Sequence, residues 1–327
     1  MVPVRDEEDS ICALIEGLLA QTLLPHEIVI TDGGSVDATR EIIQEFISDG
    51  APVKLIRERD SMPGRARNVG VEHAQCDWIA FTDAGTRPAP DWLAALAESV
   101  GDGSAVDVVY GSYDPVVDSF FKECAAIAYV PAPFASDGGF VRPRSIVSAL
   151  MRRKVWEYVG GFPEHLRSAE DLLFMRRIEQ AKCQIVRTSK AIVYWDIQPN
   201  FWFTFKRFVE YSRNNIRAGL FAEWQGMIFI YYAILAASTL DVFVFGLRGL
   251  IAPPLLWLLL LATRATKALI RNRKRYPASY ARNLARFTVL VPIIATLDAA
   301  AFIGSINWLL RDKFRLAGSR GEDDARE

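Results

Sequence analysis

The long apolar runs of this chain all lie in its last third, and this placement most constrains what the chain can fold into. Residues 226–247 (GMIFIYYAILAASTLDVFVFGL) are long enough to cross a bilayer as a helix, with Asp241 as the only charge. Two further apolar segments follow at residues 249–263 and 288–310. We therefore predict a soluble domain followed by a membrane region at residues 225–327.

Charge divides the chain at the same place. Residues 1–224 carry 32 acidic and 24 Lys or Arg side chains, whereas residues 225–327 carry 7 and 14. Basic side chains beside apolar segments are typical of a membrane surface, so we expect membrane lipids and not nucleic acid as partners. Eight of these Lys and Arg residues, with no acid, lie in residues 264–286. The positive-inside rule predicts a cytoplasmic loop here, with the soluble domain on the same side.

Two or three of the apolar segments are predicted to span the cell membrane. Residues 249–263 are short for a full span and contain Pro253 and Pro254, so a shorter, extended or re-entrant segment fits them. Residues 288–310 either span the bilayer or lie in its interface. The prediction is a multi-pass membrane protein whose soluble domain is cytoplasmic.

Residues 200–224 combine aromatic side chains with Lys206, Arg207, Arg213 and Arg217. This composition is typical of an amphipathic helix that lies at the level of the lipid headgroups. The alternative is a core helix of the soluble domain. We take residues 1–199 as the soluble domain and residues 200–224 as an interfacial helix.

Strand and helix signals alternate through the soluble domain. Short apolar runs predict strands, and helical periodicity predicts helices between them; the segments are 27–30, 53–56 and 78–81 for strands, and 42–47, 66–74 and 91–100 for helices. Such alternation favours an α/β fold with a mainly parallel sheet, whose ligands gather outside the carboxyl ends of the strands. Asp32 and Asp83 each follow such an end.

The start of the sequence and its cysteines give two further expectations. Residues 2–4, followed by RDEED, are similar to the last part of a first strand, and we expect the natural chain to begin earlier. No signal peptide is visible. The cysteines show neither a CxxC pair nor disulfide-like spacing; they are Cys12, Cys76, Cys124 and Cys183. The apolar contexts of Cys12 and Cys76 favour small core thiols, and we expect the soluble domain to stay in a reducing cytoplasm.

Five stretches carry a family resemblance, in the order in which the family has them: PVRDE (3–7), ITDGGSVDAT (30–39), PGRARNVGVEHA (63–74), FTDAGTRPAPDWL (81–93) and GGFPEHLRSAEDLLFMRRI (160–178). They resemble the first-strand exit, nucleotide loop, ARN helix, DXD region and Glu-Asp segment of the family-2 glycosyltransferases. The resemblance covers about two thirds of the chain. It implies a GT-A fold, which is a Rossmann-like mixed-sheet domain, followed here by transmembrane or interfacial helices.

The resemblance also implies roles for particular residues. It places nucleotide-sugar binding on Pro3, Arg5, Glu7, Asp32, Arg67 and Asp83. It places catalysis on Glu170 and Asp171, where Asp171 takes the proton of the acceptor hydroxyl as the sugar is transferred with inversion. Taken one at a time, these residues have plainer interpretations. Asp32 suits a turn, Arg67 a solvated helix face, and Asp171 the first turn of a helix.

The sequence departs from the family where a metal is usually bound. The DXD motif reads Asp83-Ala84-Gly85, Gly33 replaces the second Asp of the nucleotide loop, and Trp195 stands about where many relatives have an acceptor-side His. Asp83 alone remains as a ligand for Mg²⁺ or Mn²⁺, an ion that often takes only one or two carboxylates. The alternative is that arginines neutralise the diphosphate, with Arg65, Arg67, Arg87, Arg142 and Arg144 as candidates. The chain resembles a membrane-bound branch of the family that has TDAG in this place.

These expectations define one function and its rival. The favoured function is transfer of a sugar from a nucleotide-diphosphate donor to a hydroxyl of a lipid-linked or cell-envelope glycan. The lack of a QxxRW motif favours single addition over processive polymerisation. The rival is a membrane-anchored scaffold with the same fold and no turnover. A dinucleotide-dependent oxidoreductase and a nucleotidyltransferase are disfavoured, because neither class's glycine-rich phosphate loop is present.

Overall fold

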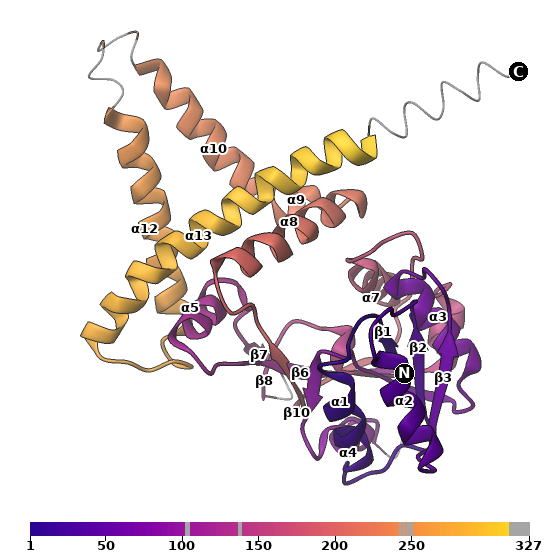
Figure 1. Cartoon of the computed structure of the whole chain (residues 1–327). Coiled ribbons are helices and arrows are strands. Elements are labelled where there is room, and N and C mark those ends of the chain that lie inside the picture. Colours follow the sequence, from indigo (N-terminus) through magenta and orange to yellow (C-terminus); the bar gives the residue numbers. More distant parts are fainter. Residues whose placement is uncertain (102–104, 137–138, 242, 244–245, 247–250, 314–327) are drawn as a thin grey trace, which may run out of the picture. The chain divides into compact units, whose positions relative to one another are not determined.

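A computed structural model describes residues 1–101, 105–136, 139–241, 243, 246 and 251–313 (Figure 1). The chain divides into two compact units. The N-terminal unit comprises Met1–Val116 and Pro131–Asp196, and the C-terminal unit comprises Val117–Val130 and Ile197–Glu327. The predicted boundary at residue 199 is therefore wrong for the segment 117–130, which belongs with the C-terminal helices.

The first half of the N-terminal unit is a parallel α/β arrangement. Its strands are β1 (Val2–Val4), β2 (Ile28–Asp32) and β3 (Val53–Arg57), and its helices are α1 (Ile11–Leu19), α2 (Thr39–Ser48) and α3 (Pro63–His73). The three strands form a parallel sheet in the order β1-β2-β3, with Val2 opposite Ile30 and Ile28 opposite Val53. All five residues of β2 are buried, which explains its unbroken β-branched run.

The second half of this unit adds a mixed sheet. Its strands run in the order β4 (Trp78–Phe81), β9 (Ala149–Arg152), β6 (Val108–Val116), β10 (Ile185–Asp196) and β5 (Thr86–Pro88), and only the β6–β10 pair is parallel. The Met1 amine donates to the Ala80 carbonyl at 2.8 Å, and the Thr82 amide donates to the Met1 carbonyl at 3.4 Å. These two bonds follow the parallel pattern and place β4 beside β1.

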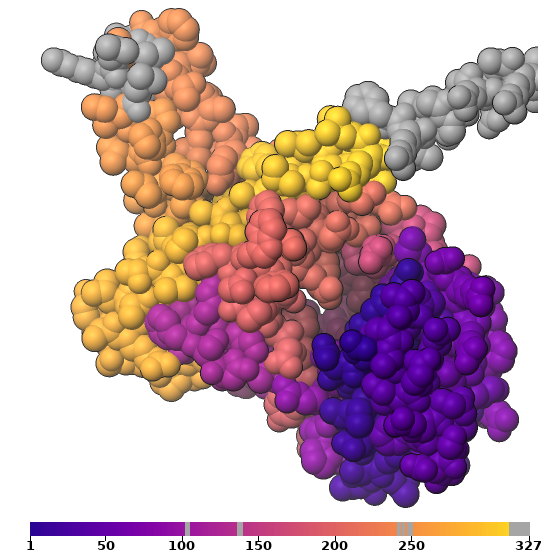
Figure 2. Space-filling model, viewed as in Figure 1, coloured from indigo at the N-terminus to yellow at the C-terminus, as the bar shows by residue number. Residues whose placement is uncertain are grey.

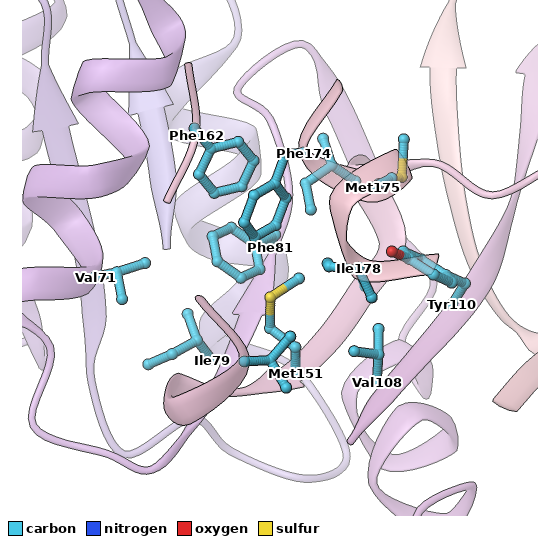
Figure 3. Close-up of a cluster of buried hydrophobic side chains, with 13 residues drawn as sticks. Val71, Ile79, Phe81, Val108, Tyr110, Met151, Phe162, Phe174, Met175 and Ile178 are labelled. Carbon is cyan, nitrogen blue, oxygen red and sulfur yellow. The ribbon is translucent and has the colours of Figure 1, made fainter. Parts of the chain in front are cut away.

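The remaining elements of the unit surround this sheet. They are α4 (Trp92–Glu98), the hairpin β7 (Phe134–Ser136) and β8 (Gly139–Val141), the 3₁₀ turn η1 (Ile146–Ser148), α6 (Arg153–Tyr158) and α7 (Glu170–Gln180). In the core, Phe162 stacks on Phe174 with ring centroids 3.8 Å apart and lies 5.7 Å from Phe81 (Figure 3). The predicted α/β fold with a mixed sheet is confirmed.

The C-terminal unit is helical. Its helices are α5 (Phe120–Tyr129), α8 (Phe201–Arg217), α9 (Phe221–Trp224), α10 (Gly226–Ser238), α12 (Ala252–Asn272) and α13 (Tyr280–Trp308), with short turns η2 (Thr239–Asp241) and η4 (Leu309–Lys313). The segment 117–130 joins this unit because Glu123 of α5 accepts hydrogen bonds from Arg282 and Arg286 of α13. Nothing in the local sequence of α5 indicates that partner, which lies about 160 residues away.

Helices α8 and α13 pack closely along one another (Figure 2). A Cβ added at Gly304 would lie 2.5 Å from the Ser212 Cβ, so the contact requires glycine. The Ser212 hydroxyl donates to the Ala301 carbonyl at 2.9 Å. On the rest of α8, Trp202 and Phe203 stay 59% and 48% exposed. The helix is amphipathic as expected, and its interfacial role stays a prediction.

Among the residues that the structure describes, two helices are long and apolar enough to cross a membrane, at Ala252–Asn272 and Tyr280–Lys313, and the apolar helix Gly226–Ser238 is shorter. The predicted run 226–247 is helical to its described limit, and residues 242, 244–245 and 247 lie outside the described residues, as do 249–250. The predicted loop 264–286 is wrong in extent, since α12 continues to residue 272 and only 273–279 connect the helices. Lys and Arg are good helix formers, and Arg264 pairs with Asp298 of α13 at 2.5 Å.

Candidate active site

The exits of β1 and β2 lie side by side and are joined by hydrogen bonds. The Asp6 amide donates to the Ser35 hydroxyl at 2.9 Å, and the Glu7 amide donates to the Thr39 hydroxyl at 2.8 Å. The Gly33 amide donates to the carbonyl of Val4 at 2.8 Å. The structure therefore brings the first two predicted motifs together at the carboxyl edge of the sheet.

Asp32 is engaged within its own turn. Its side chain is buried, and Oδ1 accepts from the amide and the hydroxyl of Ser35 at 2.9 and 2.6 Å. Its Oδ2 lies 3.9 Å from Nε of Arg40. The plainer interpretation of Asp32 as a turn residue thus describes its contacts here, and its nucleotide-binding role stays a prediction.

The other predicted residues at this edge differ in exposure. Pro3 lies in β1 opposite Thr31, and Arg5 is exposed, 3.9 Å from the Asp6 carboxylate. The Glu7 carboxylate accepts from the Ser10 hydroxyl at 2.5 Å. Of this group, only Arg5 presents a cation to solvent.

Asp83 begins a tight turn after β4. The Thr86 hydroxyl donates to the Asp83 carbonyl at 2.7 Å, and Thr86 pairs with Trp195 across β5 and β10. The turn therefore lies next to the predicted acceptor-side tryptophan. A Cβ at Gly85 would meet nothing within 4 Å, so the backbone does not require glycine there.

Arg67 of α3 joins the Asp83 turn to the Glu-Asp segment. The residue is 4% exposed; Nη1 donates to Glu170 Oε1 at 2.5 Å and Nη2 donates to Asp83 Oδ1 at 2.8 Å. Burial alone would lower the pKa of Arg67, but the Asp83 and Glu170 carboxylates raise it above its ordinary value. The alternative of a solvated helix face is wrong for this residue.

Close packing between α3 and the loop before α7 holds Arg67 in place. A Cβ at Gly64 would lie 2.1 Å from the Pro163 carbonyl oxygen, so the two segments can approach only at glycine. The Asn68 side-chain amide donates to the Phe162 carbonyl at 2.9 Å and to Glu164 at 2.8 Å. Ala169 then takes a left-handed conformation, with φ of 69°, immediately before α7. This strained residue sets the direction in which α7 begins.

The catalytic pair predicted from the sequence forms the first turn of α7. Glu170 is 4% exposed, and its Oε2 has no hydrogen-bond partner within the part of the chain that the structure describes. Asp171 is half-buried; desolvation and the adjacent Glu170 charge raise its pKa to about 7, against the opposing effect of Arg67. A carboxylate with that pKa can accept a proton near neutral pH.

The site holds more negative than positive charge. Asp83, Glu170 and Asp171 gather around the single Arg67, and Asp83 keeps a 35% exposed side chain whose Oδ2 has no contact to Arg67. The described residues contain no cluster of three or more potential metal ligands. The arrangement fits a divalent cation that takes one carboxylate oxygen from Asp83 and its other ligands from phosphate and water.

The arginines considered as a substitute for a metal are all engaged. Each pairs with a carboxylate: Arg65 with Glu58 at 3.0 Å, Arg67 as above, Arg87 with Asp196 at 2.9 Å, Arg142 with Asp114 at 3.0 Å, and Arg144 with Glu179 at 2.7 Å. Their charges are already matched, so the arginine alternative gains no support from the geometry. Trp195 packs edge-on against Tyr113 with centroids 5.9 Å apart.

A pocket of about 630 Å³ lies away from these residues, beside Met1 and between β2 and β4. Its lining is mainly apolar and includes Ile28, Trp78 and Trp92. None of the carboxylates of the candidate site lines it. The pocket is therefore separate from the chemistry inferred above.

The profile described as Glycosyl transferase family 2 matches residues 1–159. These residues are a family-2 glycosyltransferase domain. The chain is 28% identical over 188 residues to Glycosyltransferase AglE of Haloferax volcanii, covering 55% of this chain and 60% of that protein. It is 30% identical over 218 residues to the succinoglycan biosynthesis protein ExoA of Rhizobium meliloti, covering 62% and 65%. The chain thus spans less than two thirds of the length of each relative.

The fold of the chain also resembles that of a solved mannosyltransferase, PcManGT from Pyrobaculum calidifontis, described in complex with GDP-Man and Mn²⁺. The TM-score is 0.54 over 95% of this chain and 86% of the other, at 17% identity. At that identity the likeness concerns the fold alone. It agrees with the GT-A architecture predicted from the motifs.

Sequence reasoning missed the residues that support the site. Gly64 and Asn68 lie inside the stretch PGRARNVGVEHA, and Glu164 and Ala169 lie inside GGFPEHLRSAED. From these two stretches the sequence analysis names only Arg65, Arg67, Glu170 and Asp171 as site residues. The two stretches contact each other through these residues. The sequence signal that could have found these residues was that both stretches belong to motifs of the same site, so their remaining residues were candidates for contacts between them.

Proposed function

We propose that this protein is an inverting glycosyltransferase that moves a sugar from a nucleotide-diphosphate donor to a hydroxyl acceptor at the membrane. The observation that carries the proposal is the placement of Asp171, with a pKa raised to about 7, beside the Glu170–Arg67–Asp83 chain of ion pairs. Family membership of residues 1–159 supports the same reaction class.

In this mechanism Asp171 is the general base. The acceptor oxygen attacks the anomeric carbon from the face opposite the nucleotide, and Asp171 takes the hydroxyl proton. The bond from the anomeric carbon to the diphosphate oxygen breaks, and the nucleoside diphosphate leaves with the electron pair. One displacement inverts the anomeric centre, because bond making and bond breaking occur on opposite faces.

The donor end is assigned to the carboxyl edge where the β1, β2 and β4 exits meet. Asp32, Arg5 and Glu7 lie by the first two exits and Asp83 by the third. A divalent cation held by Asp83 would neutralise the negative charge that develops on the leaving diphosphate. The complex of PcManGT with GDP-Man and Mn²⁺ is consistent with this assignment.

The acceptor is proposed to be a lipid-linked or cell-envelope glycan, extended by one sugar at a time. Support comes from the two candidate membrane helices and from ExoA, whose name refers to succinoglycan biosynthesis. The exposed aromatic residues of α8, Trp202 and Phe203, suit contact with lipid headgroups. We infer a multi-pass protein with its catalytic unit in the cytoplasm, from the basic residues of 264–286.

The test is donor turnover by the full-length protein purified in detergent with lipid extract. UDP- and GDP-sugars are screened with Mn²⁺, with Mg²⁺ and with EDTA, beside Asp171→Asn and the exposed control Asp77→Asn. We expect turnover with a divalent ion that Asp171→Asn abolishes and the control retains. Binding of nucleotide with no turnover of any donor would favour the scaffold alternative. The evidence for that alternative is that Gly33 and Gly85 replace aspartates of the family motifs.

A further inference from the structure

Arg67 contacts two carboxylates that belong to different ends of the proposed site. Asp83 follows β4 at the donor end, and Glu170 opens α7 beside the catalytic Asp171. The two contacts use different nitrogens of one guanidinium, Nη2 and Nη1, at 2.8 and 2.5 Å. A single buried cation is thus shared between the donor and acceptor ends.

The guanidinium is confined to this bridging position. Its side chain is 5% exposed, its Cζ lies 5.6 Å from the Phe162 ring centroid, and its Nε is buried with no partner among the described residues. The Gly64 contact with the Pro163 carbonyl fixes the helix that carries it. Arg67 therefore cannot swing toward a phosphate while its two ion pairs hold.

The two ends compete for the same positive charge. A cation that binds Asp83 weakens the attraction between that carboxylate and Nη2 of Arg67. The ion pair between Arg67 and Glu170 then becomes stronger. Conversely, when the Glu170 charge is lost, Arg67 pairs with Asp83 alone. The guanidinium then repels a cation that binds Asp83 and weakens its binding. Both effects follow from Coulomb's law in a site of low dielectric.

We propose that Arg67 is a positioning residue that couples cation and nucleotide binding at Asp83 to the Glu170–Asp171 pair. Donor binding then strengthens the Arg67–Glu170 contact and fixes the first turn of α7 before the acceptor reacts. This inference rests on the proposed function, because it takes Asp83 as the donor-end carboxylate.

The test measures binding, with no need for a known donor or acceptor. Mn²⁺ titrations in the presence of UDP or GDP, with free Mn²⁺ read by electron paramagnetic resonance, compare Glu170→Gln with Asp171→Asn. Both variants remove one nearby carboxylate charge, but only Glu170 contacts Arg67. We expect Glu170→Gln to weaken Mn²⁺–nucleotide binding about fivefold, and Asp171→Asn to weaken it less than about twofold.

A second arm tests whether Arg67 transmits the effect. In an Arg67→Gln background, or in Arg67→Lys if the first variant does not fold, the difference between the two carboxylate variants should disappear. Equal weakening by Glu170→Gln and Asp171→Asn in the wild-type background would overturn the coupling and leave the donor site in place. No Mn²⁺-dependent binding of UDP or GDP by the wild-type protein would overturn the donor site as well.

Discussion

Each unit of the molecule has a buried cluster of arginines and carboxylates, and the two clusters differ in which charge is in excess. In the N-terminal unit three carboxylates surround Arg67, and both Glu170 Oε2 and Arg67 Nε lack a partner among the described residues. In the C-terminal unit Glu123 receives hydrogen bonds from Arg282 and Arg286. Burial alone would raise the pKa of Glu123, but these two arginines hold it below its ordinary value.

The difference separates a structural cluster from a candidate catalytic one. Arg286 is 3% exposed, and its third nitrogen donates to the Tyr276 carbonyl and the Asn283 side chain at 2.9 Å. Its charge and its hydrogen bonds are therefore matched within the fold. The cluster around Arg67 instead keeps an excess of acid and a carboxyl group of raised pKa, which is the arrangement expected where a cation and a proton are to bind.

The largest effect is expected at Asp171, the proposed catalytic base. Asp171→Asn keeps the size of the side chain and removes its ability to accept a proton, so transfer should fall about a thousandfold. Steady-state kinetics of the detergent-purified protein measure it, with Asp77→Asn as the exposed control. Loss of less than about tenfold would place the base elsewhere.

In the cluster of Glu123, Arg282 and Arg286, a substitution should change the stability of the protein. Glu123→Gln leaves the buried Arg286 without its carboxylate, which should cost about 3–5 kcal/mol in the free energy of unfolding. Asp118→Asn, at an exposed carboxylate just before the same helix that pairs with Lys122 at 2.8 Å, should cost less than about 1 kcal/mol. Chemical denaturation monitored by circular dichroism compares them, and equal losses would mean that Glu123 is not structurally special.

The contact between α3 and the loop before α7 should be sensitive to one methyl group. Gly64→Ala places a Cβ against the Pro163 carbonyl, so α3 must shift and carry Arg67 away from Glu170. We expect the protein to lose about 1–3 kcal/mol of stability and to lose turnover at least tenfold. Gly85→Ala is the matched control, because its Cβ would meet open space.

The pH dependence of rate and of stability should have opposite signs at Asp171. Its folded pKa of about 7 lies above the unfolded value near 4, so the unfolded state releases this proton first. The Asp171 contribution to stability therefore falls as pH rises from about 4 through 7, while the rate rises up to about pH 7. Thermal melts should show Asp171→Asn gaining stability over the wild type across that range. A constant difference would contradict the raised pKa.

The smallest effect is a gain of cation binding. Gly85→Asp restores the second carboxylate of the DXD motif at a position with room for a side chain. It should tighten Mn²⁺ binding about tenfold, roughly 1.4 kcal/mol, in the same Mn²⁺ titration with UDP or GDP. Such a gain would mean that glycine at this position keeps the cation affinity of the site low. Unchanged affinity would show that the turn does not face the cation.

Much of the N-terminal fold could be predicted from the sequence because its signals are local. The strand Trp78–Phe81 lies where its apolar run indicated, and β2 and β3 agree within two residues. The family resemblance supplied what periodicity could not, namely which carboxylates share a site. The membership of residues 1–159 and the GT-A-like fold are confirmed.

The rest depended on contacts between distant residues. Arg67 meets Glu170 across 103 positions, so its burial could not be inferred from the helix that carries it. For the same reason α5 looked like part of the first domain, and residues 264–272 looked like loop although Arg264 pairs with Asp298. A run of charged residues favours solvent exposure in a sequence-based prediction, but an oppositely charged partner from a distant segment can place such a residue within a packed helix.

The position of Met1 has a practical consequence for anyone who handles the protein. Its amine donates to the Ala80 carbonyl at 2.8 Å, and burial lowers the pKa of this amine to about 5. When another residue precedes Met1, the Met1 nitrogen keeps an N–H for the same bond, and that residue begins beside the apolar pocket of about 630 Å³ that Met1 lines. Residues that precede Met1, whether natural or added, therefore start against apolar walls, where an apolar side chain costs less to bury than a charged one.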